Sequence, residues 1–164
     1  MEKKYYIAYG SNLNIRQMLF RCPTARIVGT ATIKGYELLY KGSKTGAYLT
    51  IEPKEGGKVP VAVWSVWPAD VKSLDMYEGY PNFYYKQDFR LMVKRTDGTR
   101  KAYDVFAYIM HEERPLGEPS WNYIECCKDG YDDFGFDKKI LDEAFERSVS
   151  AVYDKRVRAR DYER

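Results

Sequence analysis

Two short stretches of the sequence place residue types at spacings that could support chemistry. The first is the turn Gly10–Ser11–Asn12, which ends an aromatic and aliphatic run and precedes a helix-like pattern. Backbone N–H groups at a helix start are unpaired and lie at the positive end of its dipole, so such a turn can bind a carboxylate or phosphate. From these residues alone, a plain strand–helix connection capped by asparagine is the commoner interpretation.

The second stretch surrounds Glu78, whose neighbours disfavour an ionised carboxylate. No Lys or Arg lies within four residues of Glu78, Asp75 lies one helical turn before it, and aromatic residues flank it. We also expect Glu78 to end a helix, where the dipole is negative. These influences raise the expected pKa above the ordinary value of about 4.3. Such a carboxyl group suits general acid–base catalysis near neutral pH, although an exposed glutamate at a helix end is the commoner occurrence.

The remaining reactive side chains form no pattern typical of a catalytic triad or a metal site. No Gly-x-Ser-x-Gly motif surrounds Ser11 or Ser120, which leaves a hydrolase triad with His111 little support. One histidine and three scattered cysteines do not have zinc-site spacing, so we expect no metal and no cofactor. Arg21 could lower the pKa of the adjacent Cys22 thiol, but an inert buried cysteine is the commoner case.

The composition indicates one domain over residues 1–164, with a small-molecule partner. The net charge is only +3, because 27 basic residues oppose 24 acidic ones, which gives no support for nucleic acid or a membrane surface. Sixteen tyrosines invite a base-stacking interpretation, but no basic run accompanies them. An odd number of cysteines, two of them adjacent, favours free thiols. With no signal-like start and no membrane-length apolar stretch, we expect a cytoplasmic protein.

The elements that must position these residues can be predicted from periodicity and turn signals. Strands are expected at residues 4–9, in two segments over 26–40, at 47–52 and 59–67 around a hairpin turn at 54–58, and at 84–95 and 101–110. Helices are expected from Asn12 or Asn14 to about Arg21, from Pro68 to Glu78, from about Ser120 to Lys128, and from about Asp137 to beyond Tyr153. Strands outnumber helices and hairpins join most of them. The pattern favours an α+β fold with a curved sheet, either open or closed into a barrel.

The two chemical stretches together resemble the γ-glutamylcyclotransferase family, also called AIG2-like. The resemblance rests on Tyr9-Gly10-Ser11-Asn12-Leu13 after the first strand and on Leu74-Asp75-x-x-Glu78-Gly79-x-Pro81-x-x-Tyr84. Further matches are Cys22-Pro23, Gly35-Tyr36, Thr50-Ile51, Tyr108, Pro119-Ser120-x-x-Tyr123 and Gly130-x-x-x-Phe134-Gly135-x-Asp137. The resemblance covers roughly residues 5 to 145. It implies a small mixed β-barrel with flanking helices and an active cavity at one mouth.

The resemblance also implies an activity and a set of site residues. Family members cyclise a γ-glutamyl group: its α-amine attacks the side-chain amide, releasing 5-oxoproline and an amine. By resemblance, Glu78 is the acid/base, and the substrate-binding residues are Ile7, Ala8, Tyr9, Gly10, Ser11, Asn12, Tyr84, Tyr108 and Tyr123. Tyr85 competes with Tyr84 for one of these positions. The sequence departs from the family pattern at two places: Ala47-Tyr48-Leu49 replaces smaller residues, and Pro60 stands where glycine is common. Both are expected near the sheet face that shapes the pocket for the leaving group.

Two other classes of function stay open from the sequence. One is a non-catalytic module of the same fold that binds γ-glutamyl or other carboxylates, and the other is a tyrosine-rich RNA binder. The sequence does not identify the leaving amine: an α-amino acid, a polyamine, the ε-amine of lysine and an aminoglycoside side chain all fit. It also leaves the oligomeric state, monomer or homodimer, undetermined.

Overall fold

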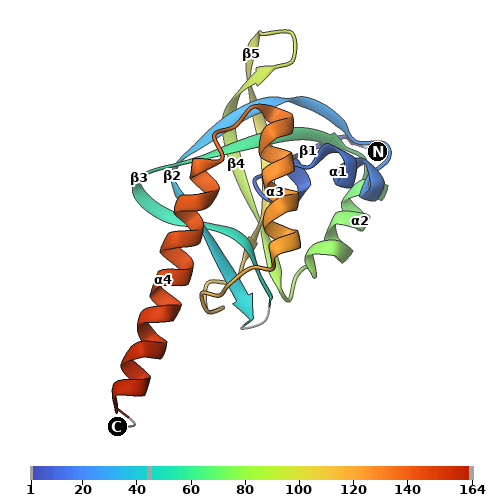
Figure 1. Ribbon diagram of the computed structural model, residues 1–164. Coiled ribbons are helices and arrows are strands. Elements are labelled where there is room, and N and C mark those ends of the chain that lie inside the picture. The colour runs from blue at the N-terminus through green and yellow to red at the C-terminus, as the bar shows by residue number, and fades with distance from the viewer. Residues whose placement is uncertain (1, 44–45, 163–164) are drawn as a thin grey trace.

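Five strands close into a barrel in the computed structural model, which describes residues 2–43 and 46–162. The strands are β1 (Lys4–Ala8), β2 (Arg26–Ser43), β3 (Gly46–Val66), β4 (Tyr84–Arg95) and β5 (Arg100–Met110), in the order β1-β3-β2-β4-β5. Neighbouring strands are antiparallel except β1 and β5, which pair in parallel at Tyr6 and Phe106 and so close the barrel. The predicted α+β mixed barrel is therefore confirmed (Figure 1).

The longest feature of the barrel is a ribbon of β2 and β3, where two predictions are wrong. Residues 26–40 form one strand with two irregularities instead of two segments, and β3 runs unbroken through the predicted hairpin turn. Pairing passes from Lys34↔Lys58 to Tyr36↔Pro53, so residues 54–57 bulge out of β3. The glycines of this segment serve a bulge, because the two chain halves pair with β2 and not with each other.

The contact between β2 and β4 is short. Among the residues that the structure describes, only Gly29↔Arg95 and Thr30↔Lys94 are paired there. A Cβ atom at Gly29 would lie 2.0 Å from the carbonyl oxygen of Lys94, so the crossing requires a residue without a side chain. The β4–β5 hairpin, by contrast, pairs from Tyr84↔Met110 to Lys94↔Arg100, as predicted.

The helices lie on the outside of the barrel (Figure 1). They are α1 (Ile15–Arg21), α2 (Pro68–Glu78), α3 (Trp121–Phe134) and α4 (Lys139–Tyr162), with a short 3-10 helix, η1 (Ser11–Leu13), after β1. Asn14 caps α1, since its side chain accepts a hydrogen bond from Gln17 N at 3.1 Å, which settles the choice between Asn12 and Asn14. Gly79 ends α2 in the left-handed region, with φ of 61°.

Of the two C-terminal helices, α4 spans the predicted residues, whereas α3 is longer than predicted. α3 continues past Lys128 because Gly130 does not end it: a Cβ there would lie 2.6 Å from Asn14 N, so this glycine lets α3 approach η1 closely. α4 packs its first half on β2, where Ser148 Oγ accepts a hydrogen bond from Tyr40 N at 2.8 Å. The second half of α4 extends away from the barrel (Figure 1). No helix among residues 2–43 and 46–162 is long and apolar enough to span a membrane.

Candidate active site

A cavity of about 340 Å³ opens at one end of the barrel, between the end of β1 and the end of α2. It is lined by Tyr6, Tyr9, Gly10, Ser11, Asn12, Tyr48, Leu49, Met76, Tyr77, Glu78, Gly79, Phe83, Tyr84, Tyr108 and Tyr123. Most of the expected site residues therefore meet at one place. Ile7 and Ala8 are the exceptions, because their side chains are buried in the barrel core and do not line the cavity.

The Gly10–Ser11–Asn12 turn forms the inner wall of the cavity. The carbonyl groups of this turn accept backbone hydrogen bonds: Leu13 N donates to Gly10 O and Asn14 N donates to Ser11 O, both at 3.1 Å. Within the described part of the chain, the N–H groups of Ser11 and Asn12 have no hydrogen-bond acceptor. A Cβ at Gly10 would lie 3.2 Å from the Tyr123 hydroxyl, so glycine also lets the turn lie close to the opposite wall.

Arg21 fixes this turn from behind and was not anticipated from the sequence. Its Nη1 donates to Asn12 Oδ1 at 2.5 Å, and its guanidinium carbon lies 3.5 Å from the centre of the Tyr77 ring. Asn12 Nδ2 donates in turn to the Tyr6 hydroxyl at 3.0 Å, and Ser11 Oγ lies 3.1 Å from the Tyr77 hydroxyl. A cation and its ordered polar neighbours thus stand beside a turn with unpaired N–H groups, an arrangement that favours an anion.

Glu78 is the last residue of α2, and its carboxyl group faces the cavity without a partner. It forms no hydrogen bond or ion pair with the residues that the structure describes. Burial raises its pKa to about 8, and the positive charge of Arg21 opposes that rise. The sequence predicted the direction of this shift.

The contribution that we expected from Asp75 is absent, however. Asp75 forms an ion pair with Lys86, with 2.9 Å between Oδ1 and Nζ, and accepts a hydrogen bond from the Tyr108 hydroxyl at 2.5 Å. Its charge is therefore compensated locally. Desolvation, and not repulsion from a neighbouring carboxylate, raises the Glu78 pKa.

Tyrosines form the rest of the inner wall, and hydrogen bonds fix several of them. The Tyr84 hydroxyl donates to Leu49 O and the Tyr123 hydroxyl accepts from Leu49 N, both at 3.0 Å. Burial raises the pKa of both phenols well above the ordinary value, so they stay neutral. Tyr85 lies on the other face of β4, where it donates a hydrogen bond to Glu112, so Tyr84 is the tyrosine of this pair that lines the cavity.

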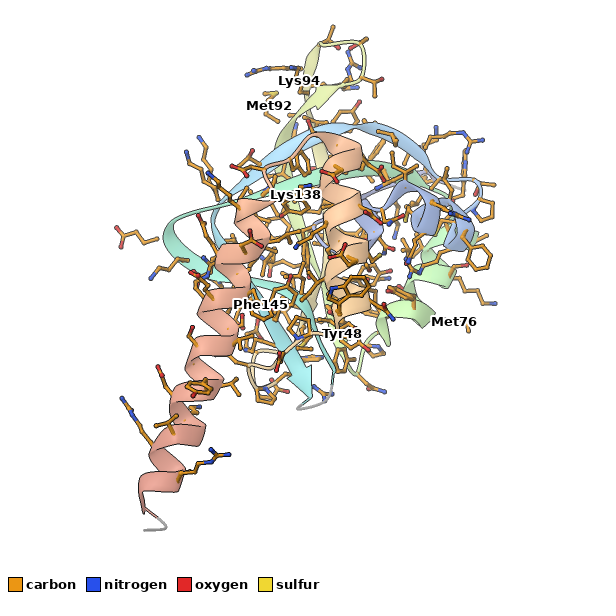
Figure 2. The ribbon with its side chains drawn as sticks, viewed as in Figure 1. Tyr48, Met76, Met92, Lys94, Lys138 and Phe145 are labelled. Carbon is orange, nitrogen blue, oxygen red and sulfur yellow. The ribbon has the colours of Figure 1, made fainter. Side chains whose placement is uncertain are left out.

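Seven further lining residues were not among the expected site residues: Tyr6, Leu49 and Gly79, and four at the outer part of the cavity. Tyr48, Met76, Tyr77 and Phe83 form the outer part of the cavity, and the first three are exposed. Figure 2 labels Tyr48 and Met76 near this end of the molecule, whereas Met92 and Lys94 mark the distant β4–β5 hairpin. Their sequence signal was only that of aromatic and apolar residues near a turn, which is equally typical of a core.

Other candidate groups do not form a site. Cys22 is fully buried, and burial raises the pKa of its thiol to about 11, so the activation by Arg21 that its position suggested is outweighed. In the described residues, no cluster of three or more histidine, cysteine, aspartate or glutamate side chains could hold a metal ion.

The chain is similar to known proteins at the level of family and fold. A profile described as "Gamma-glutamyl cyclotransferase, AIG2-like" matches residues 6–125, and no curated protein sequence matches. A solved structure named γ-glutamyl cyclotransferase is 23% identical, with a TM-score of 0.69 over 87% of this chain and 86% of that chain. The structure of an uncharacterized protein from Homo sapiens is 23% identical, with a TM-score of 0.68 over 88% of this chain and 87% of that chain. The structure of YkqA from Bacillus subtilis is 16% identical, with a TM-score of 0.72 over 92% of this chain and 55% of that chain.

Proposed function

Because the chain belongs to the AIG2-like γ-glutamyl cyclotransferase family, we propose that it is an active enzyme that cyclises γ-glutamyl amides. The products are 5-oxoproline and the amine that formed the amide. One observation carries the proposal: a desolvated, unpaired carboxyl group, that of the half-buried Glu78, lines the same cavity as an anion-binding turn. A non-catalytic binding module gains nothing from desolvating an unpaired carboxyl group, whereas an acid/base needs a raised pKa.

The turn holds the α-carboxylate of the substrate. The unpaired N–H groups of Ser11 and Asn12 donate to it, and Arg21, ordered by Asn12, supplies positive charge nearby. The γ-glutamyl chain then curls so that its α-nitrogen lies near its own amide carbon. Since both reacting groups belong to one molecule, holding this conformation is itself a large part of the rate enhancement.

Glu78 moves the protons that the ring closure requires. Its carboxylate takes one proton from the α-ammonium group, and the freed amine attacks the γ-carbonyl carbon to form the new C–N bond. Glu78 passes this first proton to the amide nitrogen, takes a second proton from the attacking nitrogen, and the old C–N bond breaks. Both protons end on the departing amine, so Glu78 returns to its starting state, and no redox partner is needed. The neutral Tyr84 and Tyr123 shape the cavity around this chemistry.

We place the enzyme in the cytoplasm with a small-molecule substrate as its partner. Cys22, Cys126 and Cys127 are free thiols, which fits a reducing compartment. The cavity has a volume of only about 340 Å³, which favours a small molecule over a nucleic-acid strand.

The test is to incubate the protein with a panel of γ-glutamyl compounds and to quantify 5-oxoproline. The panel contains γ-glutamyl amides of amino acids, of putrescine and of the ε-amine of lysine, and the Glu78→Gln variant is the control. We expect release of 5-oxoproline with at least one compound, and loss of that release in the variant. Retention of the compounds without release by the parent protein would instead support the binding module.

A further inference from the structure

The outer part of the cavity contains two aromatic rings that meet at a right angle. The rings of Tyr48 and Phe83 are 6.3 Å apart between centroids, with 83° between their planes. We call this pair the aromatic corner. A third ring can pack face-on against one of the two and edge-on against the other, which are the arrangements that aromatic pairs prefer.

Neighbouring side chains hold both rings of the aromatic corner in place. Tyr48 packs edge-on against Tyr123 at 5.1 Å and 87°. Phe83 lies 5.2 Å from the ring of Tyr84, and the guanidinium carbon of Arg114 lies 4.5 Å from its centroid. A pre-ordered corner loses little conformational freedom when a ligand enters it.

The aromatic corner is incompletely covered in the free protein. Tyr48 is 43% exposed, and Met76 and Tyr77 on the same rim are 77% and 44% exposed. Ser11 and Asn12, at the inner end, are only 8% and 3% exposed. The polar γ-glutamyl group occupies the inner end, so the leaving amine lies against these exposed apolar groups and covers them.

The charges of the cavity exclude one class of leaving amine. Glu78 carries the only carboxyl group among the described residues that line the cavity, and its raised pKa and its proton transfers prevent it from serving as a fixed counter-ion. A second ammonium group on the leaving amine, as in a polyamine, would therefore be desolvated against aromatic rings without a carboxylate partner. Such a group is expensive to bury.

We propose that the preferred substrates are γ-glutamyl amides whose leaving amine carries an aromatic ring, and that Tyr48 and Phe83 determine this specificity. The inference rests on the proposed function and names its substrate class. Both an aromatic amino acid and a plain arylalkylamine supply this chemistry, and the two are separated by the test.

The test measures kcat/KM for four compounds: the γ-glutamyl amides of phenylalanine, phenethylamine, alanine and putrescine. Both aromatic compounds are expected to exceed the alanine compound by about 10- to 100-fold, because burial of a ring against the corner is worth that much. The putrescine compound is expected to be the poorest. The ratio between the two aromatic compounds shows whether a carboxylate beside the ring matters.

Variants assign the preference to the aromatic corner. Tyr48→Ala is expected to reduce the ratio of aromatic to alanine substrate about tenfold, the contribution of an aromatic pair. Tyr48→Phe is expected to keep the ratio, and so is Tyr153→Ala, which removes a tyrosine that is 65% exposed on α4. Equal kcat/KM for the aromatic and alanine compounds, or an unchanged ratio in Tyr48→Ala, would overturn the inference.

Failure of the proposed function leaves the inference testable. If none of the four compounds releases 5-oxoproline, their binding to the parent protein is measured by calorimetry. A dissociation constant about tenfold lower for the aromatic compounds supports the aromatic subsite without catalysis. Equal dissociation constants, or no binding, overturn it.

Discussion

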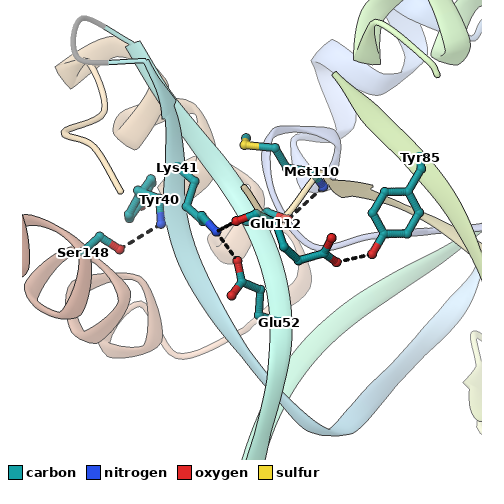
Figure 3. Close-up of polar contacts among 8 residues, drawn as sticks. Tyr40, Lys41, Glu52, Tyr85, Met110, Glu112 and Ser148 are labelled. Atoms are coloured by element: carbon teal, nitrogen blue, oxygen red, sulfur yellow. Dashed lines mark hydrogen bonds and ion pairs between the residues drawn. The ribbon is translucent and has the colours of Figure 1, made fainter. Parts of the chain in front are cut away.

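Two clusters of polar side chains in this barrel differ in whether their carboxyl groups have hydrogen-bonding or ionic partners. In the first, which we call the lysine cluster, Lys41 Nζ lies 2.5 Å from Glu52 Oε2 and donates to Glu112 O at 2.7 Å (Figure 3). Tyr85 donates to the carboxylate of Glu112 in the same view. In the second, the cavity, Glu78 has no such partner within the described residues.

The difference separates a structural charge from a functional one. Lys41 is 6% exposed, and its charge is tolerated because a carboxylate and a carbonyl oxygen meet it directly. Glu78 is desolvated without such compensation, and its pKa rises to about 8. The fold stabilises the first cluster and accepts a cost at the second, which is the pattern expected where a group must exchange protons.

The largest effect expected from this comparison is on turnover. Glu78→Gln keeps the side-chain volume but cannot exchange a proton, so kcat should fall by about 10²–10⁴-fold, the usual loss for a general acid or base. Glu52→Gln in the lysine cluster should leave kcat near that of the parent. It should instead lower the free energy of unfolding by about 1–3 kcal/mol, because Lys41 stays buried without its carboxylate.

Steady-state release of 5-oxoproline and urea denaturation of both variants check this pair of expectations. Two variants with the same phenotype, either both inactive or both merely destabilised, would remove the distinction between the clusters.

The second effect concerns stability and its dependence on pH. The folded-state pKa of Glu78 is raised, so the group favours folding fully below its unfolded value of about 4.5, and this contribution is lost as the pH rises through about 8. Glu78→Gln should therefore match the parent below pH 4.5. It should become more stable by on the order of 2 kcal/mol by pH 8, after allowance for partial solvent exposure. Thermal unfolding across this range measures the gap, and a gap that shrinks with rising pH would contradict the account.

The smallest effect is expected at Arg21, which touches the cavity residues from outside. Arg21→Met removes the charge that lowers the Glu78 pKa, so the rising limb of kcat/KM should move to higher pH. It should also raise KM about tenfold through the weakened turn. Arg21→Lys keeps the charge but not the planar fork. It should therefore raise KM but leave the rising limb of kcat/KM close to its position in the parent. An unchanged pH limb in Arg21→Met would show that Arg21 does not influence the ionisation of Glu78.

Local signals in the sequence were enough to predict much of this arrangement. The β4–β5 hairpin and the end of α2 at Gly79 follow from turn residues that act on their immediate neighbours. The direction of the Glu78 shift was predicted because aromatic residues next to it in sequence also enclose it in space.

Features that depend on distant pairing could not be predicted. The glycines at 56 and 57 signal a turn and a bulge equally well, and only the pairing of β3 with β2 decides between them. Arg21 lies 57 positions before Glu78, and Lys86 reaches Asp75 from a separate strand, so both charges meet their partners only in the closed barrel.

The most direct test of the central claim is the titration of the Glu78 carboxyl carbon by NMR, with Glu78→Gln used to assign the signal. The titration is made on the free protein, so its result does not depend on which amine the substrate carries. A midpoint near pH 8 is the result that a desolvated, unpaired acid/base requires. A midpoint near 4.5 would mean that Glu78 is solvated and ionised at neutral pH, and would contradict the account.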